Sequence, residues 1–366
     1  MSAGRGDLDA SGDPVAFCVS RALASRETVL VFDLGGSWWR VGVLTGASDI
    51  ELLDRVAAVN RVDTGKSADA IQRELVDFVV DRTRRWTDQH SVRVVGISIG
   101  AAIDGRTGSI IASAPLWGPE ATDFDLVARL RAILPEVSWA ILNDVSALAC
   151  ALLEGASAGP GGKVAAVTIS SGIAYRTIDV DSGRIPADAV HGLQGEIGHL
   201  PSWMTIAGRP VSADCECGAA NHVAAFSSGR GILQLLGRLP EARWLRGEDG
   251  DARRVLRDFG AAVAGRDPRA VELLDAFTGP LALVLLYQAT LNPEVDQTVL
   301  TGGVVDSLGD HYVASLQRNL SRDGLYLISD RDPGYFAARI ARGPDDGLQP
   351  LRGVGLYARG LESYRR

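Results

Sequence analysis

The chain has 366 residues, of which 46% are hydrophobic and 22% are charged, a composition typical of a soluble globular protein with room for two domains. Its formal net charge of -8 provides no overall attraction to nucleic acid or to an anionic membrane surface. Four cysteines are too few for a disulfide framework in a chain of this length. No apolar run reaches membrane-spanning length and no signal-peptide core precedes the first strand, so we expect a cytoplasmic protein.

The first predicted strand covers residues 28–33 and ends in a glycine-rich turn, after which a second apolar strand covers residues 39–44. The turn places Gly35, Gly36 and Ser37 directly behind Asp33. Glycines there allow a close backbone approach and expose N–H donors, as phosphate binding requires. The neighbouring carboxylate could orient a metal-bound nucleotide. The alternative is an ordinary hairpin turn.

A second candidate site follows the strand predicted over residues 137–142. This strand ends at Asn143 and Asp144, and a helix of small residues is predicted over residues 145–153. Asp144 therefore stands where a strand ends and a helix begins, the place at which open α/β sheets bind ligands. The alternative is that Asp144 serves only as the helix N-cap. A helix after Ser67 and a buried strand over residues 92–99 precede this segment.

The second half of the chain repeats the opening pattern. After a flexible stretch at 155–162, strands are predicted over residues 164–169 and 175–180, with Ser170, Ser171 and Gly172 between them. Two such turns facing one another could hold a single phosphate chain. A strand over residues 297–300 then leads into Gly302 and Gly303, a third candidate nucleotide contact. Helices are predicted over residues 228–236, 252–262, 268–291 and 348–364.

Four possible metal ligands lie close together in the sequence: His199, Cys215, Cys217 and His222. Two thiols and two imidazoles suit a closed tetrahedral zinc site. The alternative is two free thiols and two unrelated histidines, which are common in buried loops.

Taken in order, these motifs resemble those of the ROK-family sugar kinases, in the actin-like, ribonuclease-H-like ATPase superfamily. The resemblance implies an α/β fold of two lobes with a hinged cleft. The N-terminal lobe would comprise residues 1–150, with a helix at 347–366 packing back on it, and the C-terminal lobe residues 151–346. It also implies a homodimer or homotetramer. The matching segments are residues 33–37, 96–100, 143–144, 195–199, 215–218 and 301–303.

The resemblance further implies ATP and Mg²⁺ as cofactors and a structural Zn²⁺. Asp144 would be the general base that accepts a proton from the sugar hydroxyl. Asn143, Glu196 and His199 would contact the sugar, and His199 would also bind zinc with Cys215, Cys217 and His222. The nucleotide would be held by Asp33, Gly35, Gly36, Ser37, Ser171, Gly172, Gly302 and Gly303.

The chain also departs from the family pattern. His222 replaces a third cysteine, which predicts a Cys2His2 site, and Ala224 replaces a glutamate that normally contacts the sugar. In the second turn, Ala174 and Tyr175 would crowd a close phosphate approach. Trp38 and Trp39 occupy positions where smaller or basic residues are usual, and we expect Trp39, Trp38 and Trp117 to pack in the core rather than line the pocket.

The loss of a pocket carboxylate suggests an altered acceptor. A sugar that kept the matching hydroxyl would leave it unpaired, at a cost of about 1–3 kcal/mol. A deoxysugar or a C7-cyclitol, as used by the kinases of aminocyclitol biosynthesis, would fit. One alternative is a plain glucokinase or hexosamine kinase, and another is a catalytically silent sugar-binding protein. Some members of this family are transcriptional repressors with a winged helix-turn-helix domain ahead of the kinase-like core. Residues 1–27, in which a short helix is predicted at 15–24, are too few to form that domain.

Overall fold

The computed structural model of the protein describes residues 27–90, 92–105, 107–118, 120, 122–155, 161–186, 188, 191–192, 195–245, 252–344 and 346–365. The helix predicted at residues 15–24 lies outside them. The chain folds into two compact units. Unit 1 consists of Met1–Ala156, Arg176–Gln194 and Asp346–Arg366, and unit 2 of Ser157–Tyr175 and Gly195–Asp345.

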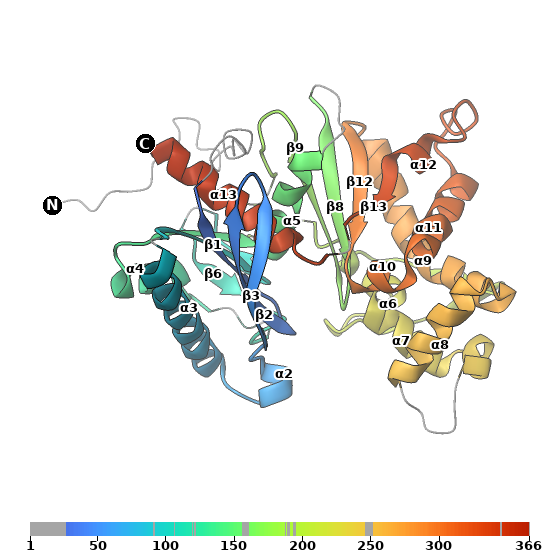
Figure 1. Ribbon diagram of the computed structural model, residues 1–366. Coiled ribbons are helices and arrows are strands. Elements are labelled where there is room, and N and C mark those ends of the chain that lie inside the picture. Colours follow the sequence, from blue (N-terminus) through green and yellow to red (C-terminus); the bar gives the residue numbers. More distant parts are fainter. Residues whose placement is uncertain are drawn as a thin grey trace. The chain divides into compact units, whose positions relative to one another are not determined.

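Unit 1 is built on a five-stranded sheet with the order β3-β2-β1-β4-β7 (Figure 1). Strand β1 is antiparallel to β2 and parallel to β4, which is in turn parallel to β7. The carboxyl ends of β1, β4 and β7 therefore meet at one edge, where Asp33 is opposite Ser98 and Ile99 is opposite Asn143. The strands are β1 (Val29–Leu34), β2 (Trp38–Thr45), β3 (Asp49–Ala57), β4 (Val94–Ile99) and β7 (Ser138–Asn143).

Helices cover both faces of this sheet because alternate residues of its strands are apolar on both sides. In β1, Phe32 belongs to one hydrophobic cluster and Val31 to another, which includes residues of α13. A Cβ on Gly353 of α13 would lie 1.7 Å from the carbonyl oxygen of Ala147 in α5, so only glycine permits this close crossing. The helices are α2 (Arg61–Thr64), α3 (Ala68–His90), α4 (Leu126–Ile133), α5 (Asp144–Leu152) and α13 (Gln349–Arg365). A short hairpin joins β5 (Ala102–Ile103) to β6 (Ile110–Ala112).

Unit 2 contains a four-stranded sheet with the order β13-β12-β8-β9, and β12 is parallel to both β8 and β13. Its strands are β8 (Lys163–Ile169), β9 (Ile173–Asp179), β12 (Val295–Thr301) and β13 (Ile340–Arg342), and from Arg176 on β9 is counted with unit 1. A hairpin of β10 (Met204–Ile206) and β11 (Arg209–Val211) and a short 3-10 turn, η2 (Ile197–His199), precede the helices. The helices are α6 (Val223–Ser227), α7 (Gly229–Arg238), α8 (Ala252–Ala264), α9 (Pro268–Leu291), α10 (Gly303–Leu308), α11 (Asp310–Asp323) and α12 (Tyr335–Arg339).

Helix α9 has the bounds that the sequence pattern predicts. By length and composition it is the one helix among the described residues that could cross a membrane, which corrects the expectation that no apolar run is long enough. Half of its most apolar stretch is nevertheless buried inside the protein, as in the core helix of a globular unit.

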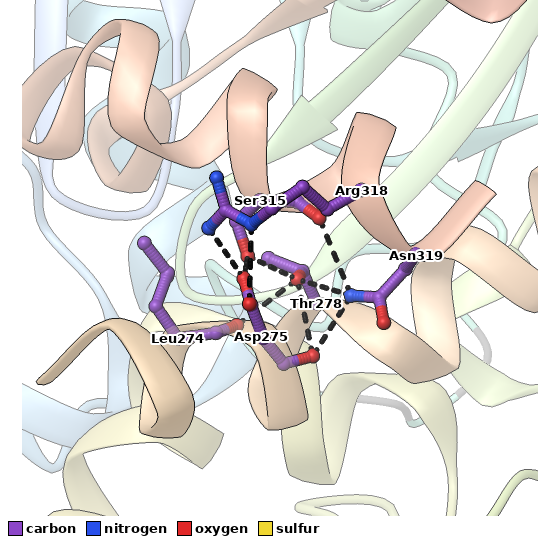
Figure 2. A network of polar contacts seen from close by, with 6 residues as sticks. All are labelled: Leu274, Asp275, Thr278, Ser315, Arg318 and Asn319. Atoms are coloured by element: carbon purple, nitrogen blue, oxygen red, sulfur yellow. Dashed lines mark hydrogen bonds and ion pairs between the residues drawn. The ribbon is translucent and has the colours of Figure 1, made fainter. Parts of the chain in front are cut away.

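A polar network joins α9 to α11 near Pro280, which removes one backbone N–H from α9 (Figure 2). Thr278 shares a hydrogen bond of 2.8 Å with Ser315, and Asn319 donates to the backbone carbonyl of Asp275 at 2.8 Å. Arg318 donates to the Asp275 carboxylate at 2.6 and 3.1 Å. These side chains fix α11 against α9 close to the proline.

Candidate functional site

Asp33 is held firmly at the carboxyl end of β1. It is 5% exposed, and Ser98 donates to its Oδ1 at 2.9 Å. Arg40 on the adjacent strand donates to its Oδ2 from Nε at 2.9 Å and from Nη2 at 2.5 Å. The third donor of Arg40, Nη1, bonds the carbonyl of Gly347 just before α13. The carboxylate is therefore both positioned and charge-compensated.

The glycine turn that follows Asp33 presents donors rather than acceptors. Two of its carbonyls accept hydrogen bonds: Asn60 Nδ2 donates to that of Gly36 at 2.9 Å, and the amide of Ala58 donates to that of Ser37 at 3.0 Å. Within the described part of the chain, the amides of Gly36 and Ser37 donate to no protein acceptor. A turn with satisfied carbonyls and unused N–H groups is suited to bind an anion such as phosphate.

The junction of β7 and α5 assigns separate tasks to Asn143 and Asp144. Asn143 is the N-cap, because its Oδ1 accepts from the amides of Val145 and Ser146 at 3.1 and 3.2 Å. Its Nδ2 donates to Asp144 Oδ1 at 3.0 Å. A Cβ on Gly100 would lie 3.5 Å from Asp144 Oδ2, so glycine keeps the space beside this oxygen open. Asn143 is thus the N-cap of α5, and Asp144 Oδ1 also accepts from the amide of Val145 at 2.9 Å.

The second turn lies at the end of β8 in unit 2. The amide of Ser170 donates to the Gly172 carbonyl at 2.9 Å, and the amide of Gly229 donates to Ser170 at 2.7 Å. No heavy atom in the described ranges lies within 4 Å of where a Cβ on Gly172 would be. The ring of Tyr175 packs against the core of unit 2, and burial raises the pKa of its hydroxyl. The side of the turn beside Gly172 is therefore open.

Gly302 lies beside this turn because β12 pairs with β8. It has φ +100°, and a Cβ there would lie 2.6 Å from the carbonyl oxygen of Ile169. Both observations require glycine at this position. Gly302 is followed by Gly303, the first residue of α10, so this second glycine pair and Ser170 lie at one edge of the unit 2 sheet.

The four candidate metal ligands come together in unit 2. One donor atom from each of the four lies within 4.8 Å of all the others. Cys215 Sγ is 3.8 Å from His199 Nδ1, and Cys217 Sγ is 3.3 Å from His222 Nδ1. His199 ends η2, and His222 is the N-cap residue of α6. Two thiols and two imidazoles at these separations match the donor set of a tetrahedral zinc site.

Ala224 faces the turn that carries Glu196 and His199. A Cβ on Gly198, in the middle of η2, would lie 3.3 Å from the Cβ of Ala224 and 2.6 Å from the carbonyl oxygen of Ile173. The first turn of α6 therefore packs directly on η2, with the methyl group of Ala224 beside Gly198.

The predicted site residues are gathered into two sets, one in each unit. Sequence reasoning missed Arg40, Ser98 and Asn60, which hold the first set in place. Trp39 and Trp117 are buried in the core of unit 1 as expected. Trp38 is 45% exposed, which corrects the expectation of a core position. The first set is Asp33, Gly35, Gly36, Ser37, Asn143 and Asp144, and the second is Ser171, Gly172, Glu196, His199, Cys215, Cys217, His222, Gly302 and Gly303.

Curated relatives match nearly the whole chain. The chain is 40% identical over 342 residues to the 2-epi-5-epi-valiolone 7-kinase of Actinoplanes sp., covering 90% of this chain and 92% of that protein. It is 30% identical over 351 residues to the C(7)-cyclitol 7-kinase of Streptomyces hygroscopicus subsp. jinggangensis, covering 90% and 93%.

Solved structures share the fold. A ROK-family glucokinase from Streptomyces griseus, in complex with glucose and AMPPNP, has a TM-score of 0.66 at 21% identity and covers 91% of this chain and 99% of that one. The ROK hexokinase of Thermus thermophilus has a TM-score of 0.63 at 21% identity, with coverages of 93% and 100%. The α/β fold of the actin-like ATPases is thereby confirmed. A model of the ROK family matches residues 30–325, and the chain belongs to the ROK family.

Proposed function

We propose that the protein is an ATP-dependent kinase that phosphorylates the 7-hydroxyl of a C7-cyclitol. The observation that carries this proposal is the 40% identity, over 90% of the chain, to a 2-epi-5-epi-valiolone 7-kinase. Two Streptomyces relatives named as C(7)-cyclitol 7-kinases support the same acceptor class at 30% identity.

Asp144 is the proposed general base. The oxygen of the acceptor hydroxyl attacks the γ-phosphorus of ATP, its proton passes to a carboxylate oxygen of Asp144, and ADP leaves. The Asn143 amide, which donates to Asp144 Oδ1 at 3.0 Å, restricts the rotation of this carboxylate. Phosphoryl transfer depends mainly on positioning and on charge stabilisation, and a well-oriented carboxylate provides the first of these.

The nucleotide phosphates are proposed to bind the unused amides of Gly36 and Ser37. In unit 2, Ser171 and Gly172 would contact phosphate, and Gly302 and Gly303 would lie against the adenosine. Mg²⁺ would neutralise phosphate charge when bound, and Asp33, whose two oxygens already accept from Ser98 and Arg40, is the carboxylate beside the turn.

The cluster of His199, Cys215, Cys217 and His222 is proposed to hold a structural Zn²⁺. Four protein ligands leave no open coordination position, so the ion would stabilise the fold and take no part in the chemistry. It would join η2 to the start of α6, and would thereby fix Glu196 and His199, the proposed contacts to the acceptor hydroxyls.

Ala224 supports an acceptor that differs from glucose. It presents a methyl group to the turn that carries Glu196 and His199, at a position where the family usually has a glutamate. An acceptor with an apolar or altered edge suits this surface, whereas a hydroxyl there would lose a hydrogen bond. We also expect a cytoplasmic homodimer or homotetramer, whose size light scattering would measure.

The test is the kcat/KM for 2-epi-5-epi-valiolone, glucose, mannose and N-acetylglucosamine, each with saturating MgATP. The proposal predicts that the cyclitol is the preferred acceptor by roughly tenfold or more, the range that one unpaired polar group imposes. A preference for glucose or for N-acetylglucosamine would contradict it and establish the plain hexose or hexosamine kinase instead.

A further inference from the structure

Two arginines stand opposite one another beside the glycine turn. The register of the sheet pairs Asp33 with Arg40, and Arg40 with Arg55 on β3. Because side chains of a strand alternate between faces, Trp38 projects from the same face as Arg40. This face of unit 1 therefore combines one carboxylate, two guanidinium groups and an indole at the end of the sheet where the turn lies.

The charge of Arg40 is compensated by an ion pair, whereas that of Arg55 is not. Arg40 is bound to the Asp33 carboxylate and to the carbonyl of Gly347. Arg55 is exposed, and the described residues offer it no carboxylate partner. Like charges directly opposite one another in an antiparallel pair are destabilising. Among the described residues, only the contact of Arg55 with the Trp38 ring offsets this cost.

The guanidinium of Arg55 leans toward the turn. Its backbone is opposite Arg40, yet its Cζ lies 3.9 Å from the ring centroid of Trp38, two residues nearer the turn along β2. Trp38 directly follows Ser37, whose amide, like that of Gly36, has no protein acceptor within the described ranges. The cation is thus held on the ring of the residue that directly follows these two unused backbone donors.

We propose that Arg55 is a phosphate-binding residue for the nucleotide at this turn, and that Trp38 is the residue that positions it. The inference rests on the proposed kinase function. The planar guanidinium offers paired donors to phosphate oxygens and keeps its charge at any working pH. It adds to the turn the positive charge that Arg40, committed to Asp33, does not supply.

The experiment compares Arg55→Met with Arg129→Met in the full-length protein. Arg129 is a matched control, because it is also an exposed arginine of unit 1 that lies over an aromatic ring, 4.9 Å from the centroid of Phe124. Isothermal titration calorimetry would measure the Kd of MgADP, MgATP and adenosine for each variant. Adenosine carries no phosphate and reports only on the adenosine contacts.

Arg55→Met is expected to raise the Kd of MgADP and MgATP by roughly tenfold to a hundredfold, the effect of one charged hydrogen-bond donor, and to leave that of adenosine unchanged. Arg129→Met should stay within about twofold of the wild type, since surface substitutions elsewhere have small effects. The melting temperature of Arg55→Met should stay close to that of the wild type, because the loss of the contact with Trp38 offsets the removal of the like-charge pair.

Trp38→Leu tests the positioning role, since it removes the aromatic platform but keeps the arginine. It should weaken MgADP binding less than Arg55→Met does, and combining the two substitutions should add little to Arg55→Met alone. Unchanged MgADP binding in Arg55→Met, or an equal loss of adenosine binding, would overturn the proposal. The binding assay needs no acceptor, so a different acceptor would refute the cyclitol assignment without affecting this inference.

Discussion

Arg40 joins the carboxylate of Asp33 to the beginning of the C-terminal segment. It donates to Asp33 Oδ2 at 2.5 and 2.9 Å and also to the carbonyl of Gly347. Helix α13, which begins two residues later, packs against β1 on the same face of the sheet. One side chain thus connects the strand that ends at the glycine turn, its neighbour β2 and the segment directly before α13.

Replacing Arg40 with Met should destabilise the protein. The Asp33 side chain is 8% exposed and would keep only Ser98 as a partner, so we expect a loss of about 3 kcal/mol in the free energy of unfolding. Urea denaturation would measure it. Asp33→Asn combined with Arg40→Met should recover part of the loss, because no buried charge then lacks a partner. A loss of less than about 0.5 kcal/mol in the free energy of unfolding of Arg40→Met would show that Arg40 and Asp33 behave as an exposed surface pair.

Asp144→Asn should abolish most of the catalysis and leave binding intact. An asparagine oxygen can still accept from the Asn143 amide and from the amide of Val145, which now donate to Asp144 Oδ1 at 3.0 and 2.9 Å. Removing a general base should lower kcat by roughly 10²- to 10⁴-fold. Steady-state kinetics and calorimetry with acceptor and MgADP would test this. A kcat within a factor of about 3 of the wild type would exclude Asp144 as the base.

Loss of the metal should impair acceptor binding more than nucleotide binding. Cys217→Ser removes one of four donors, so we expect the purified variant to contain less than one equivalent of zinc by mass spectrometry. Its affinity for the sugar or cyclitol should fall roughly tenfold or more, because the loop that positions Glu196 and His199 is disturbed. Its affinity for MgADP should stay unchanged. Cys150→Ala, which removes a buried thiol outside the cluster, should retain the zinc. Wild-type protein that carries no zinc, even after growth in zinc-supplemented medium, would refute the site.

Ala224→Glu should shift acceptor preference toward glucose. The new carboxylate would restore the hydrogen-bond acceptor that the family usually has beside Glu196 and His199. We expect η2 to move slightly, because residue 224 packs beside Gly198. We expect the ratio of kcat/KM for glucose to that for the cyclitol to rise about tenfold. Ala261→Glu, on the exposed side of α8, is the matched control and should leave the ratio unchanged. An unchanged ratio in Ala224→Glu would show that residue 224 does not select the acceptor.

Much of the fold could be predicted because the apolar patterns are strong. The bounds of α9 match the prediction and α13 is displaced by one residue. The grouping of His199, Cys215, Cys217 and His222 could be predicted because the four are close in sequence. Whether Asn143 or Asp144 caps α5 could not be read from the sequence, because both residue types are good caps.

The support of the site was harder to predict because it depends on strand register. Arg40 meets Asp33, and Arg55 meets Trp38, across strands whose alignment no local pattern encodes. The difference between Trp38 and Trp39 also follows from the pleat: Trp39 points into the core beside Phe78, and Trp38 points to the opposite face.

We propose that this chain transfers the γ-phosphate of ATP to a cyclitol hydroxyl with Asp144 as the base. Incubating the wild type and Asp144→Asn with MgATP and 2-epi-5-epi-valiolone tests this most directly. The product is identified by mass spectrometry and ³¹P NMR. We expect the wild type to form a monophosphate ester at the 7-hydroxyl and the variant to form none at comparable times. No cyclitol phosphate from active wild-type enzyme, or equal amounts from both proteins, would contradict it.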